Sequence, residues 1–431
     1  MVELPHWPFF NERAKINPST YTTTALLSAL GNPEINIPPV IHLAGTNGKG
    51  STLSFLRYIF EASGYKVHTY TSPHILRFNE RMILRGSEIS DSFLYEVLEE
   101  TRFAAAKNLI TPTFFEGTTA AAFLAFSKVK ADILLLETGM GGKFDSTNII
   151  SQPLATVITP ISYDHMQFLG STLAEIAMQK AGIIKQNTTC IVSQQYQESL
   201  EVISQVAHLQ HAKLKVFEYD WGIAKEGEDY IYSDQNNMLK FQDIGLQGDH
   251  QIINAGTAIA TINELQQYFT ITDNMIKEGL ARTKWPYRLQ KIMSGAIYKK
   301  YFNAPNEFII DGAHNTHGAV ALSLWLEQQN NKFDNYLICG MTKGRNIEDF
   351  LNKFIGQVKY IYAVNIMSEP CSYRAEEIEK AFISLGFEGE ACNTVEDVFV
   401  KLNTRINQNP YRVIACGSLF LAADIAKLNQ L

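Results

Sequence analysis

The chain has 431 residues, of which 46% are hydrophobic and 19% are charged, so it is a globular protein rather than a disordered or fibrous one. This length is more than one hydrophobic core usually serves, and two domains are expected. The formal net charge of −7 gives no support to nucleic-acid binding, which normally requires a basic excess.

The five cysteines are scattered along the chain without a CxxC spacing, and most of them lie in or near apolar runs. Buried, reduced thiols are the ordinary interpretation of this pattern, and a reducing compartment follows from it. No apolar run approaches the length of about 18 residues that a membrane helix needs, and no targeting signal precedes the first domain. The sequence therefore predicts a soluble cytoplasmic protein.

The first 40 residues are rich in proline and aromatic residues, with Trp7 to Phe10 ahead of a short helical pattern near 22–30. The segment Gly31-Asn32-Pro33 is a stop signal for that helix. We expect this arm to pack on the first domain; the alternative is that it covers a substrate ring.

A glycine-rich turn follows the apolar strand expected at 41–44, and a helical pattern begins directly after it. Glycines let the backbone turn tightly, so that its N–H groups point at an anion at the helix N-terminus. Lys49 then reaches the outer phosphates of a nucleotide, and the Ser51 hydroxyl faces a magnesium ion. The spacing departs from the usual phosphate loop, because Gly50 separates Lys49 from Ser51. A turn that only opens a helix is the alternative, but the strand before it and the helix after it favour phosphate binding.

Polar side chains also follow three further strands, expected at 65–71, 133–137 and 155–159. Ligands of open α/β sheets bind at the carboxyl ends of the strands, where Ser72, Glu137 and His165 would lie. A hydroxyl and a carboxylate suit a magnesium ion that keeps several waters. Histidine is unusual for so hard a cation, so by its chemistry alone His165 is either a ligand or a plain hydrogen-bonding residue.

The remaining elements are expected as follows. Helices are predicted at 91–109, 113–128, from 173, at 251–268 and at 273–281, with a hairpin turn near 236–237. After a domain boundary near Ser294, strands at 308–310, 336–339, 360–366 and 413–416 alternate with helices at 347–355, 376–385 and 395–406. This alternation predicts a mostly parallel sheet. The expected fold is α/β: a phosphate-loop NTPase-like domain at 1–294 with a parallel-rich sheet, and a smaller Rossmann-like domain at 295–431.

Seven motifs stand in one order along the chain: AGTNGKGS, TSPH, FNER, a helix led by FFE, ETGMGGKFDSTN, DH followed by KAGIIK, and DGAHN. In these motifs, and again at 416–418, the chain resembles folylpolyglutamate synthase and the bifunctional dihydrofolate synthase/folylpolyglutamate synthase of the Mur ligase superfamily. The resemblance implies an ATP-dependent amide ligase that forms an acyl phosphate, which L-glutamate then attacks. It also implies ATP and two magnesium ions as cofactors. The implied partners are small molecules only (folate or dihydropteroate, L-glutamate and ATP), with no nucleic acid or membrane, and the implied protein is a monomer.

The resemblance assigns a role to each matching residue. The nucleotide contacts would be Thr46, Asn47, Gly48, Lys49, Gly50, Ser51, Asn254, Arg288 and Asp311. The magnesium ligands would be Ser72, Glu137, His165 and, if it is carbamylated, Lys180. The substrate contacts would be Thr113, Phe114, Phe115, Glu116, Phe144, Asp145 and Ser146, and the catalytic residues Lys49, His165, Lys180 and His314.

The sequence departs from the family pattern in two places. Met140 and Lys143-Phe144 stand where leucine and Arg-Leu are usual, and Thr316 replaces a common proline after Asn315. Two rival hypotheses are a Mur-type cell-wall ligase and a phosphate-loop protein that is not a ligase, such as a kinase. The first lacks room for a separate nucleotide-sugar domain before the phosphate loop, and the second leaves Lys180 and the DGAHN motif unexplained. A catalytically inactive relative is disfavoured because Lys49, Glu137, His165 and Asp311 are all present.

Overall fold

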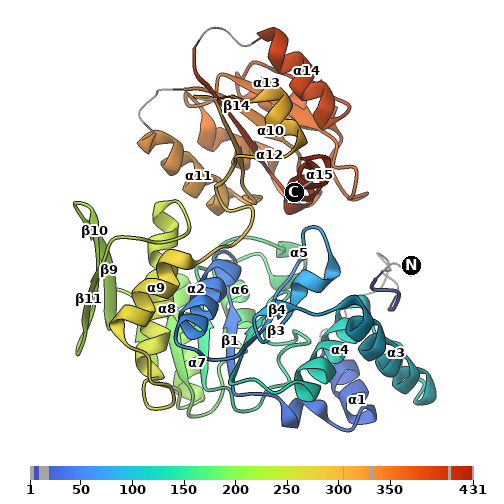
Figure 1. The fold of residues 1–431 in the computed structure, drawn as a ribbon, viewed down its shortest axis with the longest axis vertical. Helices are drawn as coiled ribbons and strands as arrows, with labels where there is room; N and C mark the ends of the chain where they lie inside the picture. Colours follow the sequence, from blue (N-terminus) through green and yellow to red (C-terminus); the bar gives the residue numbers. More distant parts are fainter. Residues whose placement is uncertain (1–3, 9–18, 304, 330–332, 406–408, 430–431) are drawn as a thin grey trace. The chain divides into compact units, whose positions relative to one another are not determined.

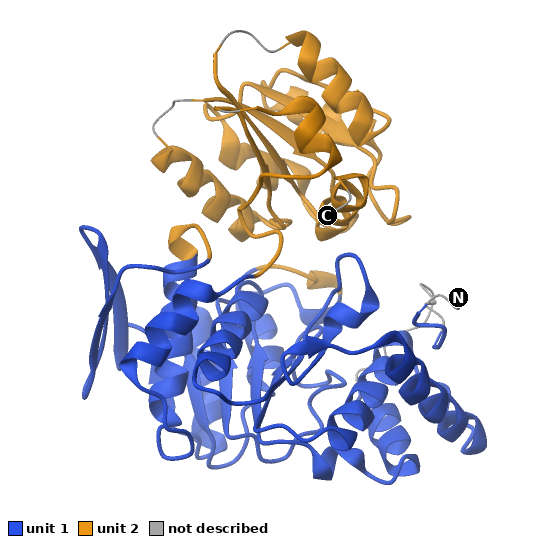
Figure 2. Ribbon diagram, viewed as in Figure 1, with its two compact units in different colours: residues 1–162, 168–245, 251–284 blue, residues 163–167, 246–250, 285–431 orange. Residues whose placement is uncertain are grey.

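The computed structural model describes residues 4–8, 19–303, 305–329, 333–405 and 409–429 (Figure 1). The chain forms two compact units (Figure 2). The first comprises residues 1–162, 168–245 and 251–284, and the second comprises residues 163–167, 246–250 and 285–431. The chain therefore passes from the first unit to the second for the last time between residues 284 and 285. The domain boundary expected near Ser294 stays a prediction. The two short loops that join the second unit were not anticipated from the sequence.

The first unit is built on an eight-stranded sheet in which the six strands from β2 to β8 are parallel and the β3–β4 hairpin is antiparallel. In spatial order its strands are β4 (Ser87–Glu88), β3 (Met82–Leu84), β2 (Val67–Tyr70), β5 (Ile133–Glu137), β1 (Val40–Ala44), β6 (Ala155–Ile158), β7 (Thr189–Val192) and β8 (Leu214–Val216). Its helical elements are α1 (Tyr21–Ala29), η1 (Pro33–Asn36), α2 (Lys49–Ala62), η2 (Phe78–Arg81), α3 (Asp91–Lys107), α4 (Phe114–Lys128), α6 (Leu173–Ala181), α7 (Gln197–Leu209) and α9 (Asp273–Arg282). Helices α5 (Met166–Leu169) and α8 (Asp249–Glu264) each begin in residues of the second unit.

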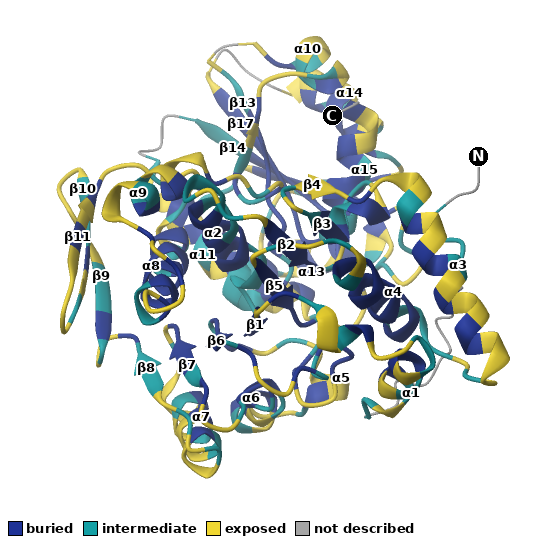
Figure 3. Cartoon of the chain, turned by 60° about the horizontal axis from the view of Figure 1, so that its bottom comes forward, coloured by how far each residue is buried: buried dark blue, intermediate teal, exposed yellow. Residues whose placement is uncertain are grey.

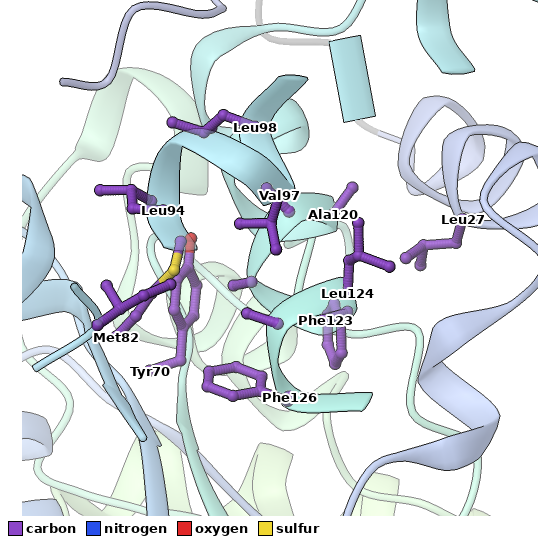
Figure 4. Packing of buried hydrophobic residues seen from close by; sticks show 14 of the residues in the cluster. Leu27, Tyr70, Met82, Leu94, Val97, Leu98, Ala120, Phe123, Leu124 and Phe126 are labelled. Atoms are coloured by element: carbon purple, nitrogen blue, oxygen red, sulfur yellow. The ribbon is translucent and has the colours of Figure 1, made fainter. Parts of the chain in front are cut away.

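The central strands are buried along their whole length, as expected for a parallel sheet covered on both faces (Figure 3). One core cluster joins α1, α3 and α4 to β2 and β5, with Phe123 and Phe126 of α4 fully buried (Figure 4). The Tyr70 hydroxyl lies 3.0 Å from the Thr119 hydroxyl at the centre of this cluster. A second cluster packs α6 and α7 against β6 and β7. Both clusters fix the strand ends from which the polar loops emerge.

A separate three-stranded antiparallel sheet is formed by β9 (Trp221–Glu226), β10 (Asp229–Asp234) and β11 (Met238–Phe241). The predicted turn at 236–237 is confirmed, because the Asp234 carboxylate accepts the backbone N–H groups of Asn236 and Asn237 at 2.8 Å. Gly256 of α8 lets the sheet approach closely, since a Cβ there would lie 2.7 Å from Ile223.

The second unit has a six-stranded sheet, parallel except for its edge strand β12. In spatial order its strands are β12 (Gln290–Ile292), β13 (Glu307–Ile310), β17 (Tyr411–Cys416), β14 (Asp334–Cys339), β15 (Tyr360–Val364) and β16 (Gly389–Cys392). The helical elements are α10 (Ala296–Tyr301), α11 (Thr316–Gln328), α12 (Ile347–Leu351), η3 (Asn352–Phe354), α13 (Ala375–Ser384), α14 (Val395–Arg405) and α15 (Leu419–Asn429). The α/β fold class predicted from the sequence is confirmed in both units. Over the described residues, no helix combines the length and apolarity needed to cross a membrane.

Candidate active site

The glycine-rich turn between β1 and α2 depends on two glycines with positive φ. Gly45 has φ +152°, and a Cβ there would lie 1.8 Å from the Thr159 hydroxyl. Gly48, at the N-cap of α2, has φ +86°, and a Cβ there would lie 2.4 Å from the Asn254 side-chain oxygen. Each position combines a positive φ with no space for a Cβ atom, and only glycine tolerates both. The loop backbone can therefore lie close to Thr159 and Asn254.

Two lysines converge on one carbonyl oxygen of this loop. Lys49 Nζ donates to the Gly45 oxygen at 3.1 Å and to the Thr46 oxygen at 3.3 Å. Lys180 Nζ, on α6, donates to the same Gly45 oxygen at 2.8 Å, and its residue is only 4% exposed. Two ammonium groups at a helix N-terminus create a strongly positive spot, which attracts the oxygens of a phosphate.

Acidic and hydroxyl groups lie directly beside the lysines. The Glu137 carboxylate, at the end of β5, is 3.9 Å from Lys49 Nζ and accepts the backbone N–H of Ser72 at 3.2 Å. Ser51 of α2 is buried in the same loop region. The structure therefore brings together Lys49, Ser72, Glu137 and Lys180 within the first unit.

A magnesium ion is the metal that this donor set fits. Glu137 offers carboxylate oxygens, Ser72 a hydroxyl, and Mg²⁺ takes oxygen ligands while keeping several waters. Among the described residues, no group of three or more His, Cys, Asp and Glu side chains is arranged to hold a metal ion. A site assembled from these side chains would thus leave room for water and phosphate oxygens.

Thr46 and Asn254 tie the loop to neighbouring elements. The Thr46 hydroxyl donates to the Ser162 carbonyl oxygen and accepts the Ser162 N–H, both at 3.0 Å. Asn254 is buried, and its amide donates to Gln251 at 2.9 Å. The backbone N–H groups of Thr46 and Asn47 are directed to the Pro160 oxygen at 3.0 and 3.2 Å.

A second glycine turn follows β5 and positions Asp145. Burial raises the pKa of the Asp145 carboxyl, which accepts hydrogen bonds from the Met140 N–H at 2.8 Å and the Thr147 hydroxyl at 2.6 Å. Because the Thr147 hydroxyl donates to Asp145, it accepts from His42 Nε2 at 2.9 Å. Burial, with a smaller effect of Lys185, lowers the pKa of His42 to about 3, so this imidazole is neutral. Asp145 is therefore held by a buried chain of hydrogen bonds, between the exposed Phe144 and the buried Ser146 in sequence.

The start of α4 carries the other predicted substrate residues. Thr113 and Glu116 form a capping box: the Glu116 carboxylate accepts the Thr113 N–H at 2.7 Å. Phe115 lies against the second glycine turn, because a Cβ on Gly139 would be 2.4 Å from its ring. The Glu116 carboxylate is thus partly committed to capping the helix, a role that the family pattern did not signal.

The described part of the N-terminal arm packs on the first unit, as expected. His6 lies 2.6 Å from the Glu99 carboxylate and stacks on Tyr95 of α3. Trp7 and Pro8 lie over Gly117 of α4, where a Cβ would be 2.4 Å from the proline ring. The aromatic pair Phe9 and Phe10 lies outside the described residues.

In the second unit, Asp311 and Arg288 lie at adjacent strand ends. The Asp311 carboxylate accepts the N–H groups of Leu289 at 2.7 Å and Ala313 at 2.8 Å. Arg288 donates to the Tyr287 oxygen at 3.0 Å, and its guanidinium lies so close to Gly312 that a Cβ there would be 2.2 Å away. The sequence paired these two residues through the family pattern alone, and the structure places them on neighbouring loops.

His165 and His314 belong to a cluster in the second unit centred on Asp164. Asp164 carboxylate oxygens lie 3.4 Å from His314 Nε2, 3.5 Å from Arg345 and 4.0 Å from His165, and Asn315 donates to Asp164 at 3.2 Å. Burial alone would raise the pKa of Asp164, but His314, Arg345 and His165 together hold it well below its usual range. His165 itself has φ +51°, and Arg345 was not signalled by any motif. The sequence named both histidines but missed the carboxylate that joins them.

The chain matches two family descriptions, the Mur ligase middle domain over residues 43–262 and the C-terminal domain of dihydrofolate synthetase over residues 296–429. It is 31% identical to a dihydrofolate synthase/folylpolyglutamate synthase of Bacillus subtilis, over 96% of this chain and 95% of that protein. It is 30% identical to a folylpolyglutamate synthase of Lacticaseibacillus casei, over 93% and 92% of the two chains.

Solved structures agree with these matches. Escherichia coli FolC in complex with DHPP and ADP has a TM-score of 0.85 at 27% identity, covering 96% of this chain and 93% of that one. The bifunctional enzyme of Yersinia pestis complexed with AMPPNP and Mn ion has a TM-score of 0.85 at 25% identity, covering 98% and 96%.

Proposed function

Because the chain belongs to the folylpolyglutamate and dihydrofolate synthase family of Mur ligases, we propose that it is an ATP-dependent ligase of folate metabolism. It joins L-glutamate to dihydropteroate, to tetrahydrofolate and its polyglutamates, or to both, and it releases ADP and phosphate. Relatives of both activities match almost the full length of the chain.

The observation that carries the proposal is the convergence of Lys49 and Lys180 on the Gly45 carbonyl oxygen, beside Glu137. A phosphate loop alone suits any nucleotide enzyme. A second lysine from α6 is buried at the same loop, where carbamylation would turn its amine into a ligand for a metal ion, and the acidic end of β5 lies within 3.9 Å of Lys49 Nζ; transfer of a phosphoryl group to a second anion requires such a combination of cation and metal ligands. Two anions that repel each other need positive charge between them, which Lys49 and a bound magnesium ion would supply.

The chemistry follows from the substrate. A carboxylate is a poor electrophile, and phosphorylation by ATP turns one of its oxygens into part of a leaving group. The loop N–H groups and Lys49 hold the triphosphate, and the glutamate amine then displaces phosphate from the acyl phosphate. The contribution of the protein is to position the groups and to neutralise their charge.

Ser72 and Glu137 are the residues that would hold a magnesium ion in the first unit, and we propose His165 and Lys180 as the further ligands. When bound, the ion neutralises phosphate charge and orients the phosphate oxygens. Lys180 can serve only after carbamylation of its amine turns a cation into a carboxylate-like group. The further residues proposed as nucleotide contacts are Thr46, Asn47, Gly48, Gly50, Ser51, Asn254, Arg288 and Asp311.

We assign the acceptor to the surface formed by the start of α4 and the second glycine turn. Phe114, Phe115 and Phe144 offer ring faces for a flat heterocycle, while Thr113, Glu116, Asp145 and Ser146 offer polar groups. His314, held by Asp164 and the Gly312 carbonyl oxygen, is proposed to act on the glutamate side of the reaction.

The test is release of ADP by the purified protein with ATP, Mg²⁺ and L-glutamate, comparing dihydropteroate with tetrahydrofolate as acceptor. Turnover with both acceptors identifies a bifunctional enzyme, and turnover with tetrahydrofolate alone identifies a polyglutamylating enzyme. Turnover with neither acceptor would contradict the proposal and return attention to a cell-wall ligase or a nucleotide-driven protein.

We further propose that the enzyme is a cytoplasmic monomer whose partners are small molecules, without nucleic acid or membrane. None of the five cysteines forms a disulfide in the part of the chain that the structure describes, in keeping with a reducing compartment. Light scattering coupled to gel filtration measures the oligomeric state.

A further inference from the structure

Arg81 is a buried arginine in the first unit to which the proposed reaction has so far assigned no part. It ends the short helix η2, and its backbone oxygen accepts the Thr71 N–H at 3.0 Å, next to Ser72. The residue is 7% exposed. Burying a guanidinium is costly unless its charge is compensated, so its surroundings require an explanation.

No carboxylate of the described residues lies within the 4 Å of an ion pair with Arg81. Its Nε donates to His74 Nδ1 at 2.8 Å, and its guanidinium lies 5.2 Å from the Phe78 ring and 5.7 Å from the Phe114 ring. The neighbouring Glu80 is committed elsewhere: its carboxylate accepts backbone N–H groups from Ile75, Leu76 and Arg77 at 2.7 to 2.8 Å. Within the described residues, the two terminal nitrogens of Arg81 make no hydrogen bond.

Two aromatic rings and one neutral imidazole compensate the charge only in part. Cation–π contacts are weaker than a hydrogen-bonded carboxylate pair. Burial accordingly lowers the pKa of the Arg81 guanidinium, against the opposing influence of Tyr70, Glu137 and Glu80. Because His74 Nδ1 accepts the hydrogen bond, its proton lies on Nε2 and this imidazole adds no charge. His74 and the two rings thus hold the guanidinium in place, and its two terminal nitrogens can still donate hydrogen bonds to a ligand.

Arg81 is near residues of both parts of the proposed site in the first unit, the acceptor surface and the phosphate loop. Phe114, whose ring it faces, begins the helix assigned to the acceptor, and Phe78 and Phe114 meet edge to face at 6.0 Å. Glu137, which interacts electrostatically with it, stands beside Lys49 and Ser72. A planar guanidinium that lies near two aromatic rings and near Glu137 of the phosphate site is suited to bind a carboxylate that must meet a phosphoryl group.

We propose that Arg81 binds the carboxylate of the acceptor, the group that becomes phosphorylated, and that His74 orients the guanidinium for this contact. The inference rests on the proposed ligase function and deepens it. A bidentate contact to the carboxylate neutralises the acceptor as it approaches the triphosphate, and the same nitrogens remain on the carbonyl side once one carboxylate oxygen carries phosphate.

The experiment pairs a change in the protein with a change in the ligand. It measures the affinity of the acceptor that the wild type turns over, and of its carboxamide analogue, in the presence of AMPPNP and Mg²⁺. The variants are Arg81→Met and Arg81→Gln, so that a neutral side chain is tested even if one variant does not fold. The matched control is Arg77→Met, which removes the same charge from an exposed arginine that pairs with Asp91 at 2.7 Å.

We expect the wild type and Arg77→Met to prefer the carboxylate over the carboxamide by about 10- to 100-fold, the range of a hydrogen-bonded charge pair. Either neutral variant at Arg81 should reduce this preference to about threefold or less, with the affinity for AMPPNP unchanged. A purely structural role would weaken both ligands equally and leave the preference intact, and that result would overturn the inference. Loss of AMPPNP affinity instead would overturn it as well, by assigning Arg81 to the nucleotide. A wild type that releases ADP with neither acceptor would overturn the proposed function itself.

Discussion

Lys49 and Lys180 donate to the same backbone oxygen, so each has a fixed position in the candidate site that an ordinary surface lysine lacks. We expect Lys49→Ala to lower the rate of ADP release by about 100- to 1,000-fold, the range seen when one preorganised electrostatic contact is removed. Circular dichroism should show an unchanged fold, since Lys49 is the first residue of α2 and does not belong to the buried core. Lys66→Ala, an exposed lysine of the same unit, is the control, and equal rates for the two variants would argue against the phosphate-loop assignment.

The buried position of Lys180 leads to a different expectation. Carbamylation would give this side chain a carboxylate-like end, which an alanine lacks. We expect Lys180→Ala to be inactive and to regain part of its activity with added acetate or formate, which replace the missing carboxylate. An alanine variant as active as the wild type would mean that no carbamate is needed.

His42 makes stability depend on pH. Its pKa is lowered to about 3 by burial, whereas in the unfolded chain it is about 6.5. The stabilisation is complete above pH 6.5 and is lost as the pH falls towards 3, because the unfolded state binds the proton first. Between pH 7 and pH 5 this group alone should remove about 2 kcal/mol from the free energy of unfolding.

The variant His42→Gln keeps a donor for Thr147 but does not titrate, so urea unfolding at pH 7 and pH 5 should show a smaller loss for the variant by about that amount. The same loss in both proteins would show that His42 is not the responsible group.

At the scale of elements, the second glycine turn and helix α6 touch through their backbones. A Cβ on Gly142 would lie 2.7 Å from the Gln179 oxygen, and a Cβ on Gly182 would lie 2.5 Å from Lys143 Cα. We expect Gly182→Ala to push α6 away, with a loss of about 1–3 kcal/mol in the free energy of unfolding and reduced activity through Lys180. Gly222→Ala is the control, because a Cβ there meets nothing within 4 Å. Thermal and urea unfolding of both variants give the comparison.

Sequence periodicity predicted the long, buried elements well. The strand expected at 133–137 is β5 with the same bounds, and the helix expected at 113–128 differs from α4 by one residue. The elements it missed are short or weakly patterned. The hairpin strands β3 and β4 have three and two residues, too few to show a period. Helix α7, between β7 and β8, is different: it buries Ser199, Ile203 and Ala207 at a spacing of four residues, so its pattern was present in the sequence but was overlooked.

The candidate site was also predicted from the sequence only in part. The contact of Ser72 with Glu137 followed from strand ends that meet at one sheet edge. The cluster around Asp164 did not follow, because His314 and Arg345 come from segments distant in sequence. Around Arg81, His74 and Phe78 are close in sequence, but the contact with Phe114 depends on a distant helix. Such contacts are set by packing, which no local pattern records.

At the scale of the whole molecule, an enzyme with two compact units often changes their arrangement when a nucleotide binds. We expect small-angle X-ray scattering to show a more compact particle with AMPPNP and Mg²⁺ than without nucleotide. Scattering profiles that coincide would mean that the nucleotide does not couple the units.

The interleaved course of the chain bears on how such an enzyme can be recombined. The second unit takes residues 163–167 and 246–250 from stretches that otherwise build the first. A hybrid made by a single cut after residue 284 would graft a foreign second unit onto two loops that evolved with the original one. An exchange of the complete second unit between relatives would therefore have to transfer three separate pieces of the chain.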